Sequence, residues 1–343
     1  MLPKYPGDGP RDLSKPLERL KVLVDAKLDG HRLDLALTTV LTWRSRAGVH
    51  RLIDGGFVRV DGRVVAPSRR VRLGETIVVE IPPNPTANPD PGAGVEFPVL
   101  YEDRWMIAVD KPAGMAVHPS GRRLDGTLIH ALHRRFRSPN DPAHDVVPRL
   151  LHRIDVETSG VVAVGLDEQF HHLVARQFED RLVQKTYLAV VRGAPPREAG
   201  TIDLAIVPDK SSAVRLKLTT ASPTDVDAAG NPRGLPAVTE YRTLRRSGDF
   251  SLVEVRPRTG RTHQIRVHMA AIGCPLVGDK LYGGDETLFL RQLAGTLADD
   301  HREALVLDRH ALHSHSLTFF HPMLDREMTV TAPLPADLQA LVP

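Results

Sequence analysis

The nine residues His152-Arg153-Ile154-Asp155-Val156-Glu157-Thr158-Ser159-Gly160 set an arginine and a carboxylate just ahead of a turn, and the apolar run 161–164 that follows is typical of a buried strand. Such a loop can present Asp155 to a cleft. Taken alone, an aspartate followed by Thr-Ser-Gly more often forms a hydrogen-bonded turn than a catalytic site. The rest of the chain has to decide between these two interpretations.

Strand-like apolar runs recur on both sides of that segment, and residues 168–181 have the pattern of a helix. The runs cover residues 106–109, 161–164, 187–191, 252–255 and 317–320. Helices do not separate them regularly, which argues against strict βαβ alternation. We therefore expect an α+β domain built on a mixed, largely antiparallel sheet.

A second, smaller pattern occupies residues 30–82. Apolar residues recur at helical spacing in two groups separated by Ser45, a residue suited to a helix N-cap; the groups are Leu33, Leu37 and Leu41, then Val49, Leu52 and Ile53. Val58-Arg59-Val60 alternates into Asp61-Gly62, which predicts a hairpin, and residues 77–81 predict a further strand. The sequence thus predicts a small N-terminal α/β domain.

The composition fits a soluble protein of two domains. The 343 residues exceed the size that single cores commonly reach, and 41% apolar with 25% charged residues is ordinary for a folded chain. No apolar run has the length of a membrane span or a signal peptide, so we expect a cytoplasmic protein without a membrane partner. A single cysteine, Cys274, leaves no intramolecular disulfide and no cysteine-clustered zinc site.

Positive charge gathers in the small domain. Residues 31–80 contain nine arginines against five acidic residues, while the whole chain has a formal net charge of only +3. A basic module beside a near-neutral body is what an RNA-tethering domain attached to an enzyme would show. A solvated charged surface would give the same balance, so motifs must decide.

The two patterns are separated by a stretch rich in Pro, Asn and Gly, which cannot form a helix or a central strand. We take this stretch as a linker. The expected organisation is an N-terminal extension at 1–29, the basic module at 30–82, the linker at 83–97, the main domain at 98–335 and a C-terminal tail at 336–343.

The basic module resembles the S4 RNA-binding domain. The resemblance lies in the segments Arg32-Leu33-Asp34, Ser45-Arg46-Ala47-Gly48-Val49-His50-Arg51-Leu52-Ile53-Asp54-Gly55-Gly56 and Val58-Arg59-Val60-Asp61-Gly62-Arg63. It implies RNA contacts from the second helix and the adjoining loop. The implied contacts, to phosphates rather than bases, are Arg44, Arg46, His50 and Arg51. An arginine-rich helix that merely faces solvent is the alternative.

The main domain resembles the RluA-type pseudouridine synthases over about residues 98–335. Besides the nine residues around Asp155, the matching segments are Asp110-Lys111-Pro112-Ala113-Gly114, Gln184-Lys185-Thr186-Tyr187, Arg258-Thr259-Gly260-Arg261-Thr262-His263-Gln264-Ile265-Arg266-Val267-His268 and Gly278-Asp279-Lys280-Leu281-Tyr282-Gly283. The resemblance implies the pseudouridine synthase fold and an isomerase that converts uridines of a structured RNA without cofactor or metal. Ribosomal RNA is the first candidate substrate and transfer RNA the second, and we expect a monomer.

The resemblance also implies roles for individual residues. Asp155 would be the catalytic carboxylate on a flipped-out nucleotide, Arg266 its charge partner, and Tyr187 the aromatic residue against the base and the acceptor of the C5 proton. Arg153 would enter the space that the flipped base leaves. Arg261 and His263 would shape the site or contact the RNA backbone, although both could equally be surface strand residues.

Three other interpretations remain open at this stage. A glycoside or nucleoside hydrolase would use two carboxylates, but Asp155 and Glu157 share one short loop, whereas hydrolase carboxylates flank the bond from separate elements. A non-catalytic RNA-binding or ribosome-assembly factor would leave the set Asp155, Tyr187 and Arg266 unexplained. A metal site formed by His310, His313, His315 and His321 is explained more simply by a sheet surface.

Overall fold

The computed structural model describes residues 19–41, 46–80, 90, 92–119, 125–138, 140–141, 144–221 and 233–343. These residues divide into two compact units. One contains the chain up to Glu96 together with Ala116–Pro148, and the other contains Phe97–Met115 together with Arg149–Pro343. Within the described residues, no helix is long and apolar enough to cross a membrane.

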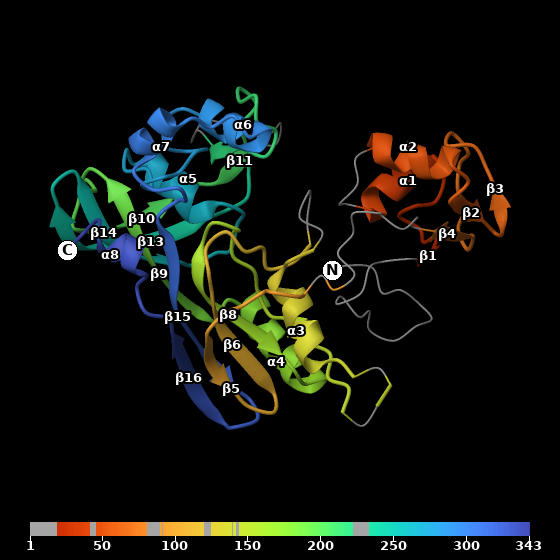
Figure 1. Cartoon of the computed structure of the whole chain (residues 1–343), viewed down its shortest axis with the longest axis horizontal. Coiled ribbons are helices and arrows are strands. Elements are labelled where there is room, and N and C mark those ends of the chain that lie inside the picture. Colours follow the sequence, from red (N-terminus) through yellow and green to blue (C-terminus); the bar gives the residue numbers. More distant parts are fainter. Residues whose placement is uncertain are drawn as a thin grey trace. The chain divides into compact units, whose positions relative to one another are not determined.

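The first unit contains a four-stranded antiparallel sheet with two helices (Figure 1). Its sheet order is β1-β4-β2-β3. The elements are β1 (Arg19–Leu23), α1 (Leu33–Val40), α2 (Arg46–Asp54), β2 (Val58–Val60), β3 (Arg63–Val64) and β4 (Thr76–Glu80). The two helices and the hairpin are where the sequence predicts them, and the leucines at helical spacing are buried in one core with the strands.

The sheet of this unit begins earlier than residue 30. β1 pairs with β4 over five residues, and its alternating burial places Leu20 and Val22 in the core. The expected N-terminal extension at 1–29 therefore includes a strand of the small domain. The signal was present in the sequence, because Leu20, Val22 and Val24 alternate with polar or exposed residues.

The segment Ala116–Pro148, which lies within the expected main domain at 98–335, groups by its contacts with the first unit. Its helix α3 (Leu128–Phe136) contacts described residues of the Pro-rich stretch. Arg134 forms an ion pair of 2.6 Å with Asp90. A Cβ on Gly92 would come within 2.8 Å of the His130 carbonyl oxygen, so the chain passes α3 closely at this glycine.

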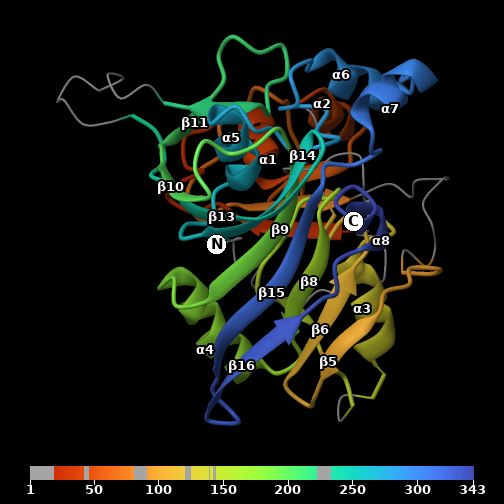
Figure 2. The same cartoon turned by 90° about the vertical axis from the view of Figure 1, so that its left-hand side faces the viewer.

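The second unit is built on a large mixed sheet (Figure 2). Its main order is β10-β13-β14-β9-β15-β8-β6-β5, with β16 beside β15 and β7 beside β8. The strands are β5 (Val99–Glu102), β6 (Met106–Lys111), β7 (Arg149–Leu150), β8 (Ser159–Gly165), β9 (Gln184–Arg192), β10 (Ala199–Asp203), β13 (Val238–Ser247), β14 (Phe250–Pro257), β15 (Leu312–His321) and β16 (Arg326–Thr331). Among the strand pairs of the described residues only β15–β8 is parallel, so the α+β architecture with a largely antiparallel sheet is confirmed.

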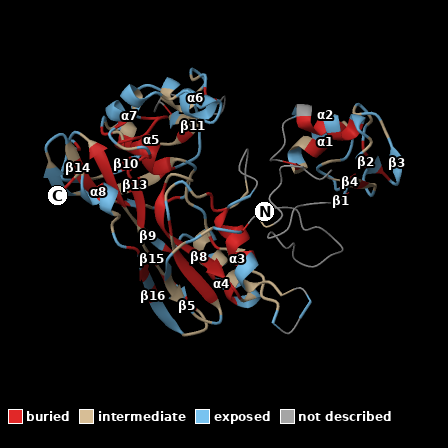
Figure 3. Ribbon diagram, in the orientation of Figure 1, coloured by how far each residue is buried: buried red, intermediate tan, exposed pale blue. Residues whose placement is uncertain are grey.

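Helices and a small hairpin complete this unit. They are α4 (Glu168–Glu179), the hairpin β11 (Ile206–Pro208) with β12 (Leu218–Thr220), α5 (Gln264–Ala271), α6 (Thr287–Ala294), α7 (Asp299–Leu305) and α8 (Ala336–Gln339). α4 and α5 each pack an apolar core against the sheet. Leu338 and Val342 are buried, so the expected tail at 336–343 packs on the main domain. Figure 3 shows that β8, at the middle of the sheet, is buried along its length.

Gly160 fixes how tightly the two central strands approach. It lies in β8 opposite Ser314 of β15, with φ +108°, and a Cβ at this position would clash with the Ser314 carbonyl oxygen. Only glycine adopts this backbone conformation without strain. The glycine that ends the nine-residue segment therefore sets where β8 begins, and with it the position of the loop that carries Asp155.

Candidate active site

A buried lysine holds the loop of Asp155 through hydrogen bonds to backbone carbonyl oxygens. Lys111 is fully buried at the end of β6, and its ammonium donates to the carbonyl oxygens of Pro112 at 2.8 Å, Met115 at 2.9 Å and Val156 at 3.1 Å. The Gly114 amide donates to the same Val156 oxygen at 2.8 Å. The turn after β6 thereby fixes the backbone immediately after Asp155.

Asp155 is paired with Arg266 of α5, 111 residues further along the chain. The Arg266 Nη1 donates to Asp155 Oδ2 at 3.3 Å, while its Nε and Nη2 donate to the two oxygens of Asp279 at 2.7 and 2.9 Å. The Asp279 side chain is fully buried, whereas that of Asp155 is 33% exposed. Arg266 thus joins a buried carboxylate to one that solvent can reach.

This arrangement keeps Asp155 ionised. Burial would raise the pKa of Asp155, but the positive charge of Arg266, assisted by His263 and His310, outweighs it and lowers the pKa below its ordinary value. The pKa of Arg266 is raised, because the pull of Asp279 and Asp155 exceeds the opposing effect of burial. At neutral pH the site therefore holds one guanidinium between two carboxylates.

Asp279 is positioned by its own backbone. Gly278 precedes it with φ +72°, and a Cβ on Gly278 would clash with the Arg309 carbonyl oxygen. The Asp279 Oδ1 also accepts the Leu281 and Tyr282 amides, both at 3.0 Å. The segment Gly278-Asp279 is thus a tight turn whose carboxylate is directed at Arg266, a role that the sequence analysis did not assign to it.

Tyr282 and His263 border the same guanidinium. The Arg266 Cζ lies 4.9 Å from the centre of the Tyr282 ring, and His263 Nδ1 lies 2.9 Å from the Tyr282 hydroxyl oxygen. His263 precedes α5 in the left-handed conformation, φ +55°. Its pKa is lowered by burial and then by Arg266, so the imidazole is neutral at pH 7. Tyr282 is a second site residue that the sequence analysis did not single out.

Glu157 belongs to a separate group behind the loop. Its Oε1 accepts Lys280 Nζ at 3.1 Å, and its Oε2 accepts the His310 amide at 3.0 Å. Lys280 also donates to the Asp308 carbonyl oxygen. His310 Nε2 lies 2.8 Å from the Thr158 hydroxyl oxygen. Both Glu157 oxygens are therefore occupied by structural contacts, which argues against Glu157 as the second carboxylate of a hydrolase.

Tyr187 lies on β9 opposite Ser314 of β15. Burial and then the charge of Asp155 raise the pKa of Tyr187 to about 12, against a smaller lowering by a hydrogen bond with Ser314. The phenol is therefore protonated at neutral pH. The dependence on Asp155 indicates that the two side chains lie near each other.

The remaining predicted site residues differ in how they are held. Arg153 is exposed. Arg261 donates through Nε to the Pro236 carbonyl oxygen at 3.1 Å. The structure thus brings Asp155, Arg266, His263 and Tyr187 into one neighbourhood, while Arg153 and Arg261 extend from the adjoining loops.

In the small domain, two of the four predicted RNA contacts, Arg46 and His50, bond to a buried carboxylate. Asp34 accepts Arg32 Nε and Nη2, Arg46 Nη2 at 3.0 Å and His50 Nε2 at 3.0 Å. Arg46 nevertheless keeps 58% of its side chain exposed, and Arg51 is exposed. Arg44 and the expected N-cap Ser45 lie outside the described residues.

Three of the four histidines considered as metal ligands are not at a sheet surface, contrary to the expectation, whereas His315 is partly exposed. His310, His313 and His321 are buried. His313 Nδ1 lies 2.9 Å from the Ser159 hydroxyl oxygen. His321 lies 3.2 Å from Asp103. In the part of the chain that the structure describes, no three His, Cys, Asp or Glu residues are grouped as a metal site would require.

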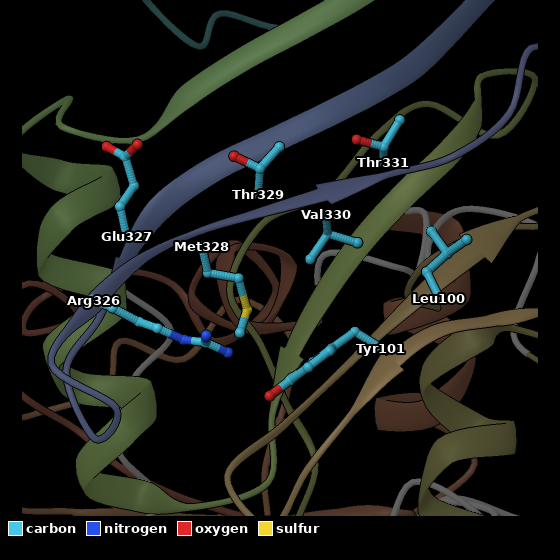
Figure 4. A pocket seen from close by; sticks show the side chains of 8 residues that line it. All are labelled: Leu100, Tyr101, Arg326, Glu327, Met328, Thr329, Val330 and Thr331. Atoms are coloured by element: carbon cyan, nitrogen blue, oxygen red, sulfur yellow. The ribbon is translucent and has the colours of Figure 1, made fainter.

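A shallow pocket of about 340 Å³ lies elsewhere on the sheet, between β5 and β16 (Figure 4). It is lined by Leu100, Tyr101, Arg326, Glu327, Met328, Thr329, Val330 and Thr331. None of the residues around Asp155 lines it, so it belongs to a different part of the unit.

Comparison with known proteins shows which family the chain resembles. Residues 105–271 match the family model for RNA pseudouridylate synthase, and residues 32–77 match that for the S4 domain. An uncharacterised RNA pseudouridine synthase of Chloroflexus aurantiacus is 37% identical over 98% of this chain and 96% of its own length. Ribosomal large subunit pseudouridine synthase D of Xanthomonas campestris is 38% identical over 96% of this chain and 94% of its own.

A solved structure shares the fold as well. Human RNA pseudouridylate synthase domain containing 1 superposes with a TM-score of 0.54 and 27% identity, covering 72% of this chain and 88% of that one. With the matched motifs, the shared sheet and relatives alike over nearly their whole length, the chain belongs to the RNA pseudouridine synthase family and is an isomerase that acts on RNA.

Proposed function

We propose that this enzyme isomerises specific uridines of large-subunit ribosomal RNA and that Asp155 is the carboxylate that acts on the target nucleotide. Relatives from three genera, Xanthomonas, Zymomonas and Xylella, are named for the large ribosomal subunit, which supports the substrate. The observation that carries the assignment of Asp155 is its ion pair with Arg266, whose guanidinium is anchored on the buried Asp279.

The reaction breaks the bond between ribose C1′ and uracil N1, turns the base, and joins C1′ to C5. A proton leaves C5 and one is gained at N1, so the reaction needs no cofactor. The first step requires an anionic oxygen beside the sugar, either to attack C1′ or to remove a proton from C2′. Asp155 meets this requirement, because it is ionised and a third of its side chain remains open to solvent.

Arg266 binds Asp155 through one carboxylate oxygen and leaves the other available to the substrate. Two of the guanidinium nitrogens bind Asp279, which leaves one donor for Asp155, at the longer distance of 3.3 Å. The second oxygen of Asp155 makes no hydrogen bond with a described residue, and a substrate can reach it. When a bound base excludes water, the guanidinium opposes the rise in the pKa of Asp155 that desolvation would otherwise cause.

Tyr187 packs against the target base in this proposal. Because its pKa is raised to about 12, a tyrosinate is not available at rest to take the C5 proton. The oxygen can accept that proton only if its own hydroxyl proton leaves to water in the same step, because the Ser314 hydroxyl already donates to the Val161 carbonyl oxygen. Tyr187 thus acts first as an orienting residue and only in concert as a proton carrier.

The other loops serve RNA binding. We propose that Arg153, which is exposed beside Asp155, enters the space left by the flipped uridine. Arg261 and His263 shape the mouth of the site in front of α5. In the small domain, Arg44, Arg46, His50 and Arg51 contact phosphates. Transfer RNA is the second candidate substrate, and the enzyme acts as a monomer in the cytoplasm.

Tritium release tests the proposal directly. Large-subunit ribosomal RNA is transcribed with UTP that carries tritium at C5 and is incubated with the wild type and with Asp155→Asn. The wild type releases tritium at specific uridines. The variant loses at least about 10³-fold in rate, because the amide is uncharged and is neither nucleophile nor base, while its RNA affinity and melting temperature change little.

The controls test the choice of RNA substrate separately from the role of Asp155. Transfer RNA labelled in the same way shows whether the activity belongs to the second candidate. An Asp155→Asn variant with near-normal turnover would remove Asp155 from the mechanism. If the wild type releases tritium from neither RNA, both ribosomal and transfer RNA are excluded as substrates.

A further inference from the structure

Lys185 occupies the sheet face that carries Tyr187. Side chains alternate along a strand, so residues 185, 187 and 189 of β9 point to the same side. Ala189 packs in the core beneath α5, and Val183, just before the strand, packs in the core beneath α4. Lys185 therefore lies between the two cores, and Tyr187, two residues further along β9, packs at the edge of the core beneath α5.

The ammonium of Lys185 reaches both segments that form the active site. Its Nζ lies 3.6 Å from the point where a Cβ on Gly260 would stand, in the loop before α5. It also lies 5.2 Å from the centre of the Phe178 ring. That ring stacks on His152 with 5.2 Å between centroids, and His152 is three residues before Asp155.

Lys185 forms no ion pair with a residue that the structure describes. No carboxylate of the described residues pairs with it within 4.0 Å. Burial lowers the pKa of Lys185, and burial followed by the charge of Lys185 lowers the pKa of His152 to about 3. The His152 imidazole is therefore neutral, and of these two neighbours the Lys185 ammonium is the one that carries positive charge.

Two other lysines of the same unit have the hydrogen-bond partners expected of a lysine with a structural role. Lys111 donates to three carbonyl oxygens, and Lys280 donates to Glu157 and to the Asp308 carbonyl oxygen. Lys185 has no such oxygen among the described residues. The Lys185 Nζ is not one of the fully buried polar atoms that are left without a hydrogen bond. Solvent therefore reaches it. A partly buried cation with an open donor is suited to an anion that arrives from outside.

We propose that Lys185 binds a phosphate of the RNA strand in the active site, next to the target nucleotide. The inference rests on the proposed function, since it needs RNA to enter beside Asp155. Lys185 and Tyr187 are two residues apart along β9, or about 7 Å. That separation suits one nucleotide whose base lies against Tyr187 and whose neighbouring phosphate meets the ammonium.

Binding of a 12-nucleotide oligo(U) to the full-length protein tests this, with Lys185→Met, Lys185→Arg and the matched control Lys210→Met, which removes an exposed lysine of the turn after β11. Met keeps the packing against Phe178 and removes the charge. For Lys185→Met we expect about fivefold weaker binding at 0.1 M salt, with the slope of log affinity against log salt smaller by about 0.7. Lys185→Arg and Lys210→Met keep the wild-type slope. An unchanged slope in Lys185→Met overturns the proposal.

A second measurement does not depend on how well the variant folds. In an oligo(U) of the same length with uncharged methylphosphonate linkages, the difference between wild type and Lys185→Met disappears if the contact is to phosphate. A difference that persists shows a contact to base or sugar and overturns the proposal. Inorganic phosphate, compared with chloride at equal ionic strength, does not displace oligo(U) from the wild type. Displacement that depends on Lys185 would show a site for free phosphate instead.

Turnover on labelled large-subunit ribosomal RNA separates this proposal from the proposed function. Lys185→Met is expected to raise KM about fivefold and to change kcat little, because a phosphate contact is made equally before and during reaction. No tritium release by the wild type would reject the proposed substrate and leave the oligo(U) result to decide on Lys185. Normal KM in Lys185→Met, with an unchanged salt slope, rejects the phosphate contact alone.

Discussion

Two buried aspartates organise the two units of this enzyme in opposite ways. Asp34 of the small domain is a buried anion surrounded by cations that remain exposed, with Arg32 at 40% and Arg46 at 58%. In the catalytic unit the buried partner is the cation, Arg266, which lies between Asp279 and the partly exposed Asp155. The first arrangement presents positive charge to solvent, and the second presents a negative oxygen.

The difference corresponds to what each unit has to do with RNA. Cations arranged around a buried carboxylate are positioned for phosphates, and they can exchange one anion for another. A guanidinium fixed by a fully buried aspartate cannot move toward a phosphate, so it serves the neighbouring carboxylate instead. The same two residue types thus give a binding surface in one unit and a reactive group in the other.

Asp279→Asn should produce the largest effect of the changes that test this comparison. It leaves the buried Arg266 without its charged bidentate partner, and breaking a buried ion pair in this way costs about 3–5 kcal/mol. We also expect loss of turnover, because Arg266 is then free to turn both donors onto Asp155 and to occupy the oxygen that must meet the sugar. Thermal melting and tritium release measure the two losses.

The pH dependence provides a check on the cause. The pKa of Asp279 is lowered by Arg266 despite burial, so its contribution to stability is complete above the ordinary pKa of an aspartate and is lost as the pH falls through the lowered value. The difference in stability between wild type and Asp279→Asn should therefore be constant near neutral pH and shrink below about pH 4. A difference that is the same at pH 3 and pH 7 would contradict the ion pair as its source.

Asp34→Asn removes the corresponding carboxylate of the small domain and should have a smaller effect. Its partners Arg32 and Arg46 are exposed and regain water when the charge is lost, whereas Arg266 cannot. We expect less than half the stability loss of Asp279→Asn, confined to the small domain, with turnover retained. Hydrogen exchange of the α1 and α2 amides reports the local loss. Equal destabilisation by the two substitutions would show that exposure of the partner does not matter.

Much of this organisation could be predicted from the chain itself. Apolar periodicity indicates α1, α2 and the central strands, because each buries one face or both. The ion pair of Asp155 with Arg266 was expected, but only from the resemblance to a family, since the 111 residues between them carry no spacing signal. The role of each residue in the reaction stays a prediction until turnover is measured.

Contacts that depend on tertiary packing were not accessible in this way. Asp279 was part of a recognised motif, yet its pairing with Arg266 follows from the turn at Gly278 and from the burial of both groups. β1 was overlooked because a polar, Pro-rich start masked three alternating apolar residues. His313 was expected at a surface because its strand alternates, but β15 lies inside a wide sheet and is covered on both faces there.

The smallest effect is expected for Arg51→Ala, which tests whether the small domain binds phosphates through its outward cations. Arg51 lies exposed in the last turn of α2, outside the group around Asp34. Its removal should leave the melting temperature unchanged, lower oligo(U) affinity a few-fold, and reduce the salt slope by about 0.7 to 1. Arg63→Ala, an exposed arginine of β3 that was not assigned to RNA, is the matched control. A specific phosphate contact at α2 would make Arg51→Ala, and not Arg63→Ala, change the salt slope. Equal weakening of binding by both substitutions would show that the affinity comes from the net charge of the domain.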